Sequence, residues 1–191
     1  MKLSKILAPL LALCLFASTA CASTFIDAHG NEIQLDDSLE AYAAVTLVGA
    51  NDAARQGETN LGDLWTDALR WFAVSGEINA AFDEDDVKAG NDHIAVDADH
   101  VVALWNGGNL RADIAEGTFG AEALAEVLPF PNKVAVVYMS GAQLLEALEA
   151  ASQALPYTAE TANACASLMQ VSGLTYTVDV RYMLHGYNPI D

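Results

Sequence analysis

The chain has 191 residues and a formal net charge of −18 at pH 7, with 26 acidic side chains against 8 Lys and Arg. Its 53% content of hydrophobic residues is too high for a disordered acidic tail, and the length suits one ordinary domain with a substantial core. Because nucleic acids and anionic membrane surfaces attract basic faces, the charge argues against both as partners. The longest apolar run is too short for a membrane span.

The first 22 residues are typical of an export signal. Two lysines precede an apolar run over residues 6–16, and small residues on both sides of Cys21 form a cleavage site. We predict a signal peptide over 1–22, cleavage near Ala22 and a periplasmic or secreted protein. The alternative is a lipoprotein anchored at Cys21, but Ser18 stands where such signals usually carry a branched aliphatic residue.

Cleavage near Ala22 would leave Cys165 as the single cysteine of the exported chain, so no intrachain disulfide is expected. An unpaired cysteine is more often a small buried apolar residue than a nucleophile. We therefore expect Cys165 to be buried.

Beyond the signal, strand and helix patterns alternate. Apolar runs around a Gly-Asn pair predict a hairpin over 24–35. The clearest helix has apolar residues at 3.6-residue spacing from Leu61 to Phe72, with Asn60 as its expected N-cap and Arg70 on its solvated face. The remaining patterns predict strands over 42–48, 101–105 and 134–139, and one or two strands over 170–180 with Gly173 between them. They also predict helices over 121–128 and 140–151 and a polar loop over 83–93.

Two of these strands, 101–105 and 134–139, are uninterrupted apolar runs. Such runs are typical of strands that are buried on both faces. We therefore expect both segments to lie inside a sheet that helices cover.

The segment from Asn106 to Arg111 is the most informative for function. A predicted buried strand ends in Gly107 and Gly108, which allow a sharp turn and a close approach of a ligand to the backbone. Arg111 adds a guanidinium group, a planar and permanently charged fork of N–H donors that suits phosphate or carboxylate. From the spacing alone, a tight turn followed by a surface arginine is an equally good interpretation.

Cations are scarce, since only six Lys and Arg residues follow the predicted signal. An anion site in so acidic a chain must use local cations. Arg55, just before the predicted helix, and Arg111 both lie where a loop meets a rigid element. These two arginines are therefore the best candidates.

Five segments, in order along residues 45–180, resemble the 5′-nucleotidase C-terminal domain family. They are 55–68 (RQGETNLGDLWTDA), 106–113 (NGGNLRAD), 127–132 (VLPFPN), 140–149 (SGAQLLEALE) and 170–176 (QVSGLTY). The resemblance implies an α+β fold, in which a mixed β-sheet packs with helices, over residues 45–191. Residues 23–44 would then be a hairpin lead-in.

The resemblance implies a substrate-specificity domain that holds a nucleotide, or another phosphorylated small molecule, for phosphate-ester hydrolysis in nucleotide catabolism. The implied substrate-binding residues are Arg55, Asn106, Gly107, Gly108, Arg111, Phe130 and Asn132. Arg55, Asn106 and Arg111 match positions on the ribose and phosphate side. Phe130 matches an aromatic that stacks on the base, and Asn132 a contact to the base edge. Without the resemblance, Phe130 would be interpreted as a core aromatic between two prolines.

The chain departs from the family pattern in two respects. The two-metal phosphoesterase half, which needs roughly six or seven His, Asp and Asn ligands, has no counterpart among His29, His93, His100 and His185. The elements 27–29 and 90–93 that loosely resemble metal-binding motifs are interpreted as coincidences. The family's last strand and its second base-stacking aromatic are also missing, so the sheet is expected to lack its last strand.

We therefore expect no catalytic residue, metal ligand or cofactor in this chain, with a divalent metal pair only in a separate metallophosphatase domain or chain. The family is a hydrolase family, but turnover would need that partner. The alternative is a non-catalytic periplasmic binding module or a decayed remnant of a nucleotidase.

Overall fold

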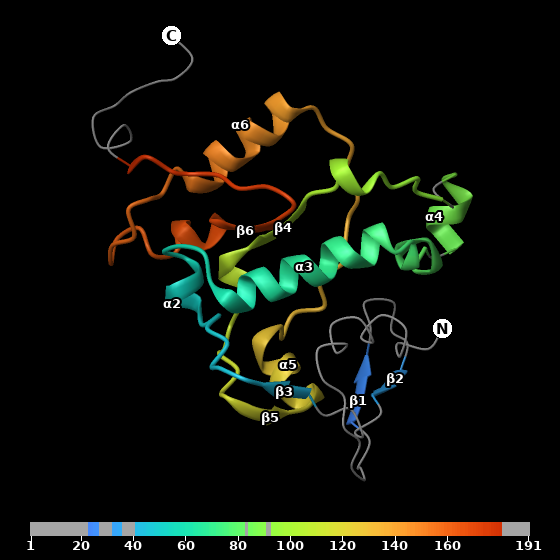
Figure 1. Cartoon of the computed structure of the whole chain (residues 1–191), viewed down its shortest axis with the longest axis horizontal. Helices are drawn as coiled ribbons and strands as arrows, with labels where there is room; N and C mark the ends of the chain where they lie inside the picture. Colours follow the sequence, from blue (N-terminus) through green and yellow to red (C-terminus); the bar gives the residue numbers. More distant parts are fainter. Residues whose placement is uncertain (1–22, 27–31, 36–40, 83, 91–92, 181–191) are drawn as a thin grey trace.

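A computed structural model of the chain describes residues 23–26, 32–35, 41–82, 84–90 and 93–180. They form an α+β fold of helices and three two-stranded antiparallel sheets, arranged around the long helix α3 (Figure 1). The predicted α+β class is confirmed, but the predicted mixed sheet is not, because every strand pair in the described residues is antiparallel. The strands are β1 (Ser23–Ile26), β2 (Glu32–Leu35), β3 (Ala41–Ala43), β4 (Ala103–Asn106), β5 (Gly117–Phe119) and β6 (Met169–Ser172).

The helices are of two kinds. The α-helices are α2 (Asn51–Ala54), α3 (Asn60–Val74), α4 (Glu84–Lys88), α5 (Ala121–Val127) and α6 (Gly141–Ser152). The 3-10 helices are η1 (Glu77–Ala80), η2 (Ala98–His100), η3 (Gly107–Asn109) and η4 (Ala164–Ser167). None of the helices in the described ranges is both long and apolar enough to cross a membrane.

The three sheets pair β1 with β2, β3 with β5, and β4 with β6. The β1–β2 pair confirms the predicted hairpin, with Ser23 opposite Leu35 and Ile26 opposite Glu32; its turn lies outside the described residues. The strand predicted over 42–48 is shorter, because after β3 only an isolated bridge forms, between Leu47 and Ile114.

Strand β4 is less enclosed than its apolar sequence predicts. Among the described strands it pairs with β6, and α3 packs against both strands. Of the four residues of β4 only Ala103 is buried, and the other three are partly exposed. The expectation of burial on both faces is therefore wrong for this strand, because within the described residues its sheet has two strands, with α3 packed on both and α6 packed on β6, and no further described strand covers the other edge of β4.

Helix α3 confirms the clearest periodic pattern, but its N-cap is Thr59 and not Asn60. The Thr59 hydroxyl accepts a hydrogen bond of 3.1 Å from the Gly62 amide. Asn60 instead forms hydrogen bonds with the segment that precedes α2. Its side chain accepts from the Val48 amide and donates to the Thr46 carbonyl. An asparagine amide that offers both a donor and an acceptor can satisfy an extended backbone in this way.

Arg70 does not lie on a solvated face. Its Nε donates to the Val101 carbonyl at 3.0 Å and its Nη2 to the Ala98 carbonyl at 2.6 Å. The side chain thus ties the middle of α3 to the chain that leads into β4. The sequence prediction failed here because a long charged side chain can reach backbone carbonyls that periodicity does not reveal.

Other predicted elements are confirmed. Helix α5 covers the expected range, and α6 begins with the predicted capping box, in which Ser140 and Gln143 bond each other's backbone amides. The segment 83–93 differs from the predicted loop because it contains the short helix α4, but it is solvated as expected, since none of the residues of α4 is buried. Cys165 is buried, as its apolar role requires.

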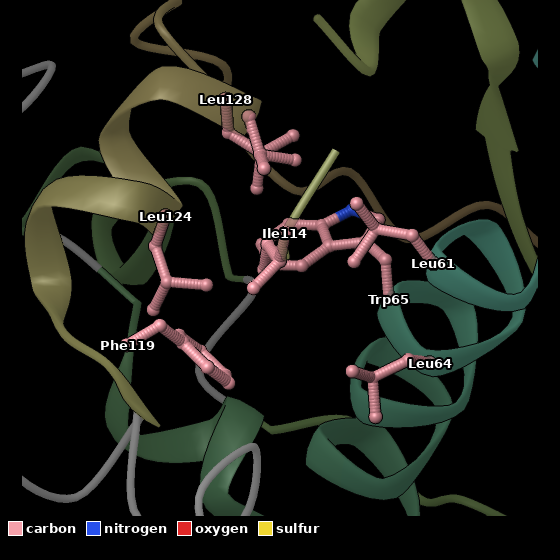
Figure 2. Close-up of a pocket in the computed structure, with 8 residues that line it drawn as sticks. Leu61, Leu64, Trp65, Ile114, Phe119, Leu124 and Leu128 are labelled. Carbon is pink, nitrogen blue, oxygen red and sulfur yellow. The ribbon is translucent and has the colours of Figure 1, made fainter. Parts of the chain in front are cut away.

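A hydrophobic core lies between α3, α5 and the segment that follows η3. Its buried members are Ala43, Ala54, Leu61, Leu110, Ile114 and Val127. An apolar cavity of about 20 Å³ opens beside this core, where Leu124 and Phe119 face Leu64 across a gap (Figure 2). That volume has room for about one water molecule, so the cavity does not suit a nucleotide.

The apolar segment 134–139 contradicts the prediction of a buried strand. All six residues are exposed, and none of the described strands pairs with the segment. A β-strand needs a neighbour to satisfy its backbone amides and carbonyls, and this segment has none in the ranges that the structure describes. High β-propensity alone therefore did not produce a strand.

This exposure predicts that Val137→Lys leaves stability almost unchanged. Val137 is 66% exposed, so its replacement should alter the free energy of unfolding by no more than about 0.5 kcal/mol in a urea titration. The matched control is Val127→Lys in the core, which should unfold the chain. Equal, large losses in both variants would show that 134–139 is a buried strand after all.

The last predicted strand region, 170–180, divides at its glycine. Strand β6 ends at Ser172, and Gly173 has a φ of +86°, which favours glycine. Residues 174–179 form no strand and fold back, since the Tyr176 hydroxyl donates to the Met169 carbonyl at 2.7 Å. Of the predicted region, only residues 170–172, before Gly173, lie in a described strand.

Candidate functional site

The glycine loop begins where β4 ends. Gly107 and Gly108 are buried in η3, and the Gly107 amide donates to the Leu168 carbonyl at 2.8 Å. A Cβ on Gly107 would overlap the Ala54 carbonyl oxygen, and one on Gly108 would press on Ala166. Both glycines are thus required by the close approach of the protein's own backbone, from α2 and from η4. The sequence alone predicts the close approach of a ligand at these two positions.

The side chain of Asn106 holds the glycine loop through hydrogen bonds to other residues of the protein. Its Nδ2 donates to the Ala166 carbonyl at 3.1 Å, and its Oδ1 accepts from Asn109 Nδ2 at 2.8 Å. The amide that was a candidate ligand contact therefore connects β4 to η4.

Arg111 and Phe130 lie together. The Arg111 guanidinium carbon is 5.4 Å from the centre of the Phe130 ring, and its Nη1 donates to the Gly108 carbonyl at 2.9 Å. The neighbouring Leu110 is fully buried, and the Arg111 amide donates to the Val127 carbonyl, so the backbone here is anchored in the core. Phe130 is 45% exposed, which contradicts the alternative of a core aromatic.

Arg55 follows α2 and is only partly exposed. Its Nη1 donates to the Ala162 carbonyl at 2.9 Å, which links it to the loop between α6 and η4. The same loop is tied to α2 a second time, because the Tyr157 hydroxyl donates to Asp52 at 2.7 Å.

The predicted site residues are thus connected through the glycine loop. Arg111 contacts both Phe130 and Gly108, while Arg55 is joined to them indirectly, through the packing of Gly107 on Ala54. Asn132 is exposed, and its amide donates to the Phe130 carbonyl at 2.8 Å, so it lies in the same turn as the ring.

Two residues that sequence reasoning did not single out support this region. Asp113 Oδ1 accepts from the amides of Gly49 and Ala50, both at 2.8 Å, just before α2. Gln170, in β6, binds both ends of the loop that carries Arg55. Both lie inside segments that carried the family resemblance, which was the signal that could have found them.

Asp63, in the first turn of α3, has an unusual pKa. Partial burial, together with the nearby acidic side chains of Glu58 and Asp67, raises its pKa from 3.8 to about 6. An ionised Asp63 therefore destabilises the folded chain. Its contribution to stability is most favourable below pH 3.8 and is lost as the pH rises through 6.

Asp63→Asn should consequently raise the melting temperature at about pH 8, where Asp63 carries a charge, and this gain should shrink as the pH falls from about 7 towards about 4. Thermal melts of both proteins across this range test it. Asp99→Asn, at an exposed position on η2, is the control for lost charge. A gain that does not depend on pH would contradict the raised pKa.

No group of three or more His, Cys, Asp or Glu side chains in the described ranges is placed to hold a metal ion. His100 is exposed and contacts Asp97 at 2.7 Å. The elements 27–29 and 90–93 lie wholly or partly outside those ranges. The described residues therefore do not fit a two-metal centre.

Comparisons with known proteins show what the chain is similar to. The family model for the 5′-nucleotidase C-terminal domain matches residues 20–183. The trifunctional nucleotide phosphoesterase protein YfkN of Bacillus subtilis (strain 168) is 29% identical over 153 residues, which is 80% of this chain and 9% of that protein. A 5′-nucleotidase precursor from Thermus thermophilus, known from a crystal structure, is 32% identical, with a TM-score of 0.49 over 69% of this chain and 20% of that one.

The chain thus spans a small part of the proteins it matches. Because the family model covers most of its length, the chain belongs to the 5′-nucleotidase C-terminal domain family.

Proposed function

We propose that this chain is an exported substrate-binding domain that holds a nucleotide for phosphate-ester hydrolysis. The observation that carries the proposal is the pairing of Arg111 with Phe130 at 5.4 Å on an exposed surface. A guanidinium recognises an oxyanion through charge-assisted hydrogen bonds, and an aromatic ring stacks on any base. The two groups together match a ligand that is both anionic and flat-ringed.

The surroundings of the pair favour a fixed orientation. The Gly108 carbonyl holds the Arg111 fork, and the buried Leu110 anchors its backbone. We propose that the fork contacts the phosphate, that the base stacks on Phe130, and that Asn132 contacts the base edge. Arg55 adds a second cation to the phosphate and ribose side, in a chain whose net charge is otherwise strongly negative.

Hydrolysis itself is proposed to take place on a metallophosphatase domain or chain that carries the divalent metal pair. Both relatives are several times longer than this chain, so they have room for such a domain. The basic and apolar sequence of residues 1–22 supports export to the periplasm or beyond, with cleavage near Ala22 favoured over a lipid anchor at Cys21.

A second candidate, a non-catalytic binding module or a decayed remnant, is favoured by one observation. The side chains of Arg55 and Asn106 already bind carbonyls of the protein itself, at Ala162 and Ala166. Such contacts are what a purely structural role would produce.

Calorimetric titration of the purified chain separates these candidates. We expect AMP to bind more tightly than adenosine or inorganic phosphate, because only AMP engages both Arg111 and Phe130. No heat at millimolar AMP would favour the remnant. A parallel assay of phosphate release from AMP with added Mn²⁺ should show no turnover, and activity of the lone chain would overturn the assignment of hydrolysis to a separate domain.

A further inference from the structure

Gln170 is a buried polar residue with an unusually complete set of partners. It lies in the middle of β6, opposite Trp105 of β4, and is 1% exposed. Its Oε1 accepts from the Thr59 amide at 3.0 Å and from the Thr59 hydroxyl at 3.3 Å. Its Nε2 donates to the Ala54 carbonyl at 3.1 Å and to the Gly57 carbonyl at 2.9 Å. All the hydrogen-bonding capacity of one side-chain amide is thereby used.

These partners belong to one short loop. Ala54 ends α2 and Thr59 caps α3, so Gln170 joins the two ends of the segment that carries Arg55. The helix has made room for this contact, because a Cβ on Gly62 would overlap Gln170 Oε1. One amide on a paired strand therefore sets the path of the Arg55 loop.

The same contact reaches the glycine loop. The Ala54 carbonyl that accepts from Gln170 is also the atom that a Cβ on Gly107 would overlap. The Arg55 loop and the glycine loop thus meet at one carbonyl group, and Gln170 holds that group in place. A shift of Ala54 would displace both loops relative to each other.

We propose that Gln170 is a positioning residue that fixes Arg55 relative to the glycine loop and Arg111. The inference rests on the proposed function only for the role of Arg55 in binding a nucleotide. The positioning itself is a property of this chain's own contacts and can be tested without a ligand.

The first test is limited proteolysis of the whole chain with trypsin, which cleaves after Arg55 and after Lys88. Gln170→Leu keeps the side-chain volume but removes all four hydrogen bonds. We expect cleavage after Arg55 to become about tenfold faster relative to cleavage after Lys88 in the exposed helix α4. Ile78→Ala, a buried residue beyond the far end of α3, controls for general loss of stability and should leave this ratio unchanged. An unchanged ratio in Gln170→Leu would overturn the inference.

The second test is a double-mutant cycle on AMP affinity. Gln170→Leu should raise the dissociation constant about tenfold in the chain with Arg55 and should have no effect in the Arg55→Ala chain. An equal effect in both chains, or no effect of Arg55→Ala alone, would overturn the role of Gln170 in binding. If the unaltered chain binds no AMP, the proposed function fails, while the proteolysis ratio still tests the positioning.

A conservative variant covers the case in which Gln170→Leu does not fold. In Gln170→Glu, an ionised carboxylate would face the carbonyls of Ala54 and Gly57, whereas a protonated one can donate to one of them. The affinity of Gln170→Glu for AMP, relative to the unaltered chain, should therefore be low at about pH 8 and should recover as the pH falls to about 5.5. A ratio independent of pH would contradict the proposal.

Discussion

Replacing Arg111 by alanine is expected to raise the dissociation constant for AMP roughly 30-fold, a loss of about 2 kcal/mol. The guanidinium lies over Phe130 and is oriented by the Gly108 carbonyl, so the substitution removes the fork and leaves the loop backbone anchored by Leu110. Calorimetric titration measures the change. Arg111→Lys should recover only part of the affinity, since an ammonium keeps the charge but lacks the planar fork.

Lys88→Ala is the matched control for the loss of one positive charge. Lys88 is an exposed residue of α4 whose ion pairs with Glu84 and Asp85 are solvent-screened, so its removal should leave both affinity and stability nearly unchanged. If Lys88→Ala weakens AMP binding as much as Arg111→Ala does, the effect comes from the net charge of the chain and not from a site. If Arg111→Ala binds AMP normally, the proposed site is wrong.

The parts of the fold that could be predicted are those specified by local sequence. The periodic apolar face of α3 and the capping box of α6 involve residues within a few positions of one another, so the sequence pattern contains the whole interaction. The failures involve distant partners. Asn60 and Arg70 bind backbone groups 12 and 31 residues away, and their residue types do not indicate which carbonyl or amide they will reach.

The segment 134–139 shows a second limit. Its apolar run predicts a buried strand, but burial depends on a neighbouring strand, and no described strand takes that place. An apolar sequence pattern identifies a segment that can form a strand, but the segment becomes a strand only if another strand pairs with it.

The family resemblance selects the candidate site residues, but it does not indicate how the protein connects them. The family resemblance implies that Arg111 and Phe130 both bind the substrate, and the structure places these two side chains in contact. The resemblance did not indicate that Asn106 would be used internally, or that Gln170 would hold the Arg55 loop. Supporting contacts of this kind join segments that lie 60 and 116 residues apart, so only the three-dimensional structure reveals them.

Gly107→Ala is expected to destabilise the chain by about 3 kcal/mol or more, because the added methyl group would overlap the Ala54 carbonyl oxygen. Backbone on both sides of this contact is held: Gly107 bonds the Leu168 carbonyl, and Ala54 accepts from Gln170. Neither side can move without losing a buried hydrogen bond. Urea titration with a fluorescence or circular dichroism signal measures the loss.

Gly57→Ala is the matched control, since a Cβ there would meet no atom within 4 Å. It should change the free energy of unfolding by no more than about 0.5 kcal/mol. Gly108→Ala should fall between the two, because the Cβ it adds meets the side chain and backbone of Ala166 at 2.5 Å or more. Equal stability of Gly107→Ala and Gly57→Ala would show that α2 and the glycine loop do not touch. The indirect connection between Arg55 and Arg111 would then be lost, and with it the basis for a single anion site that uses both arginines.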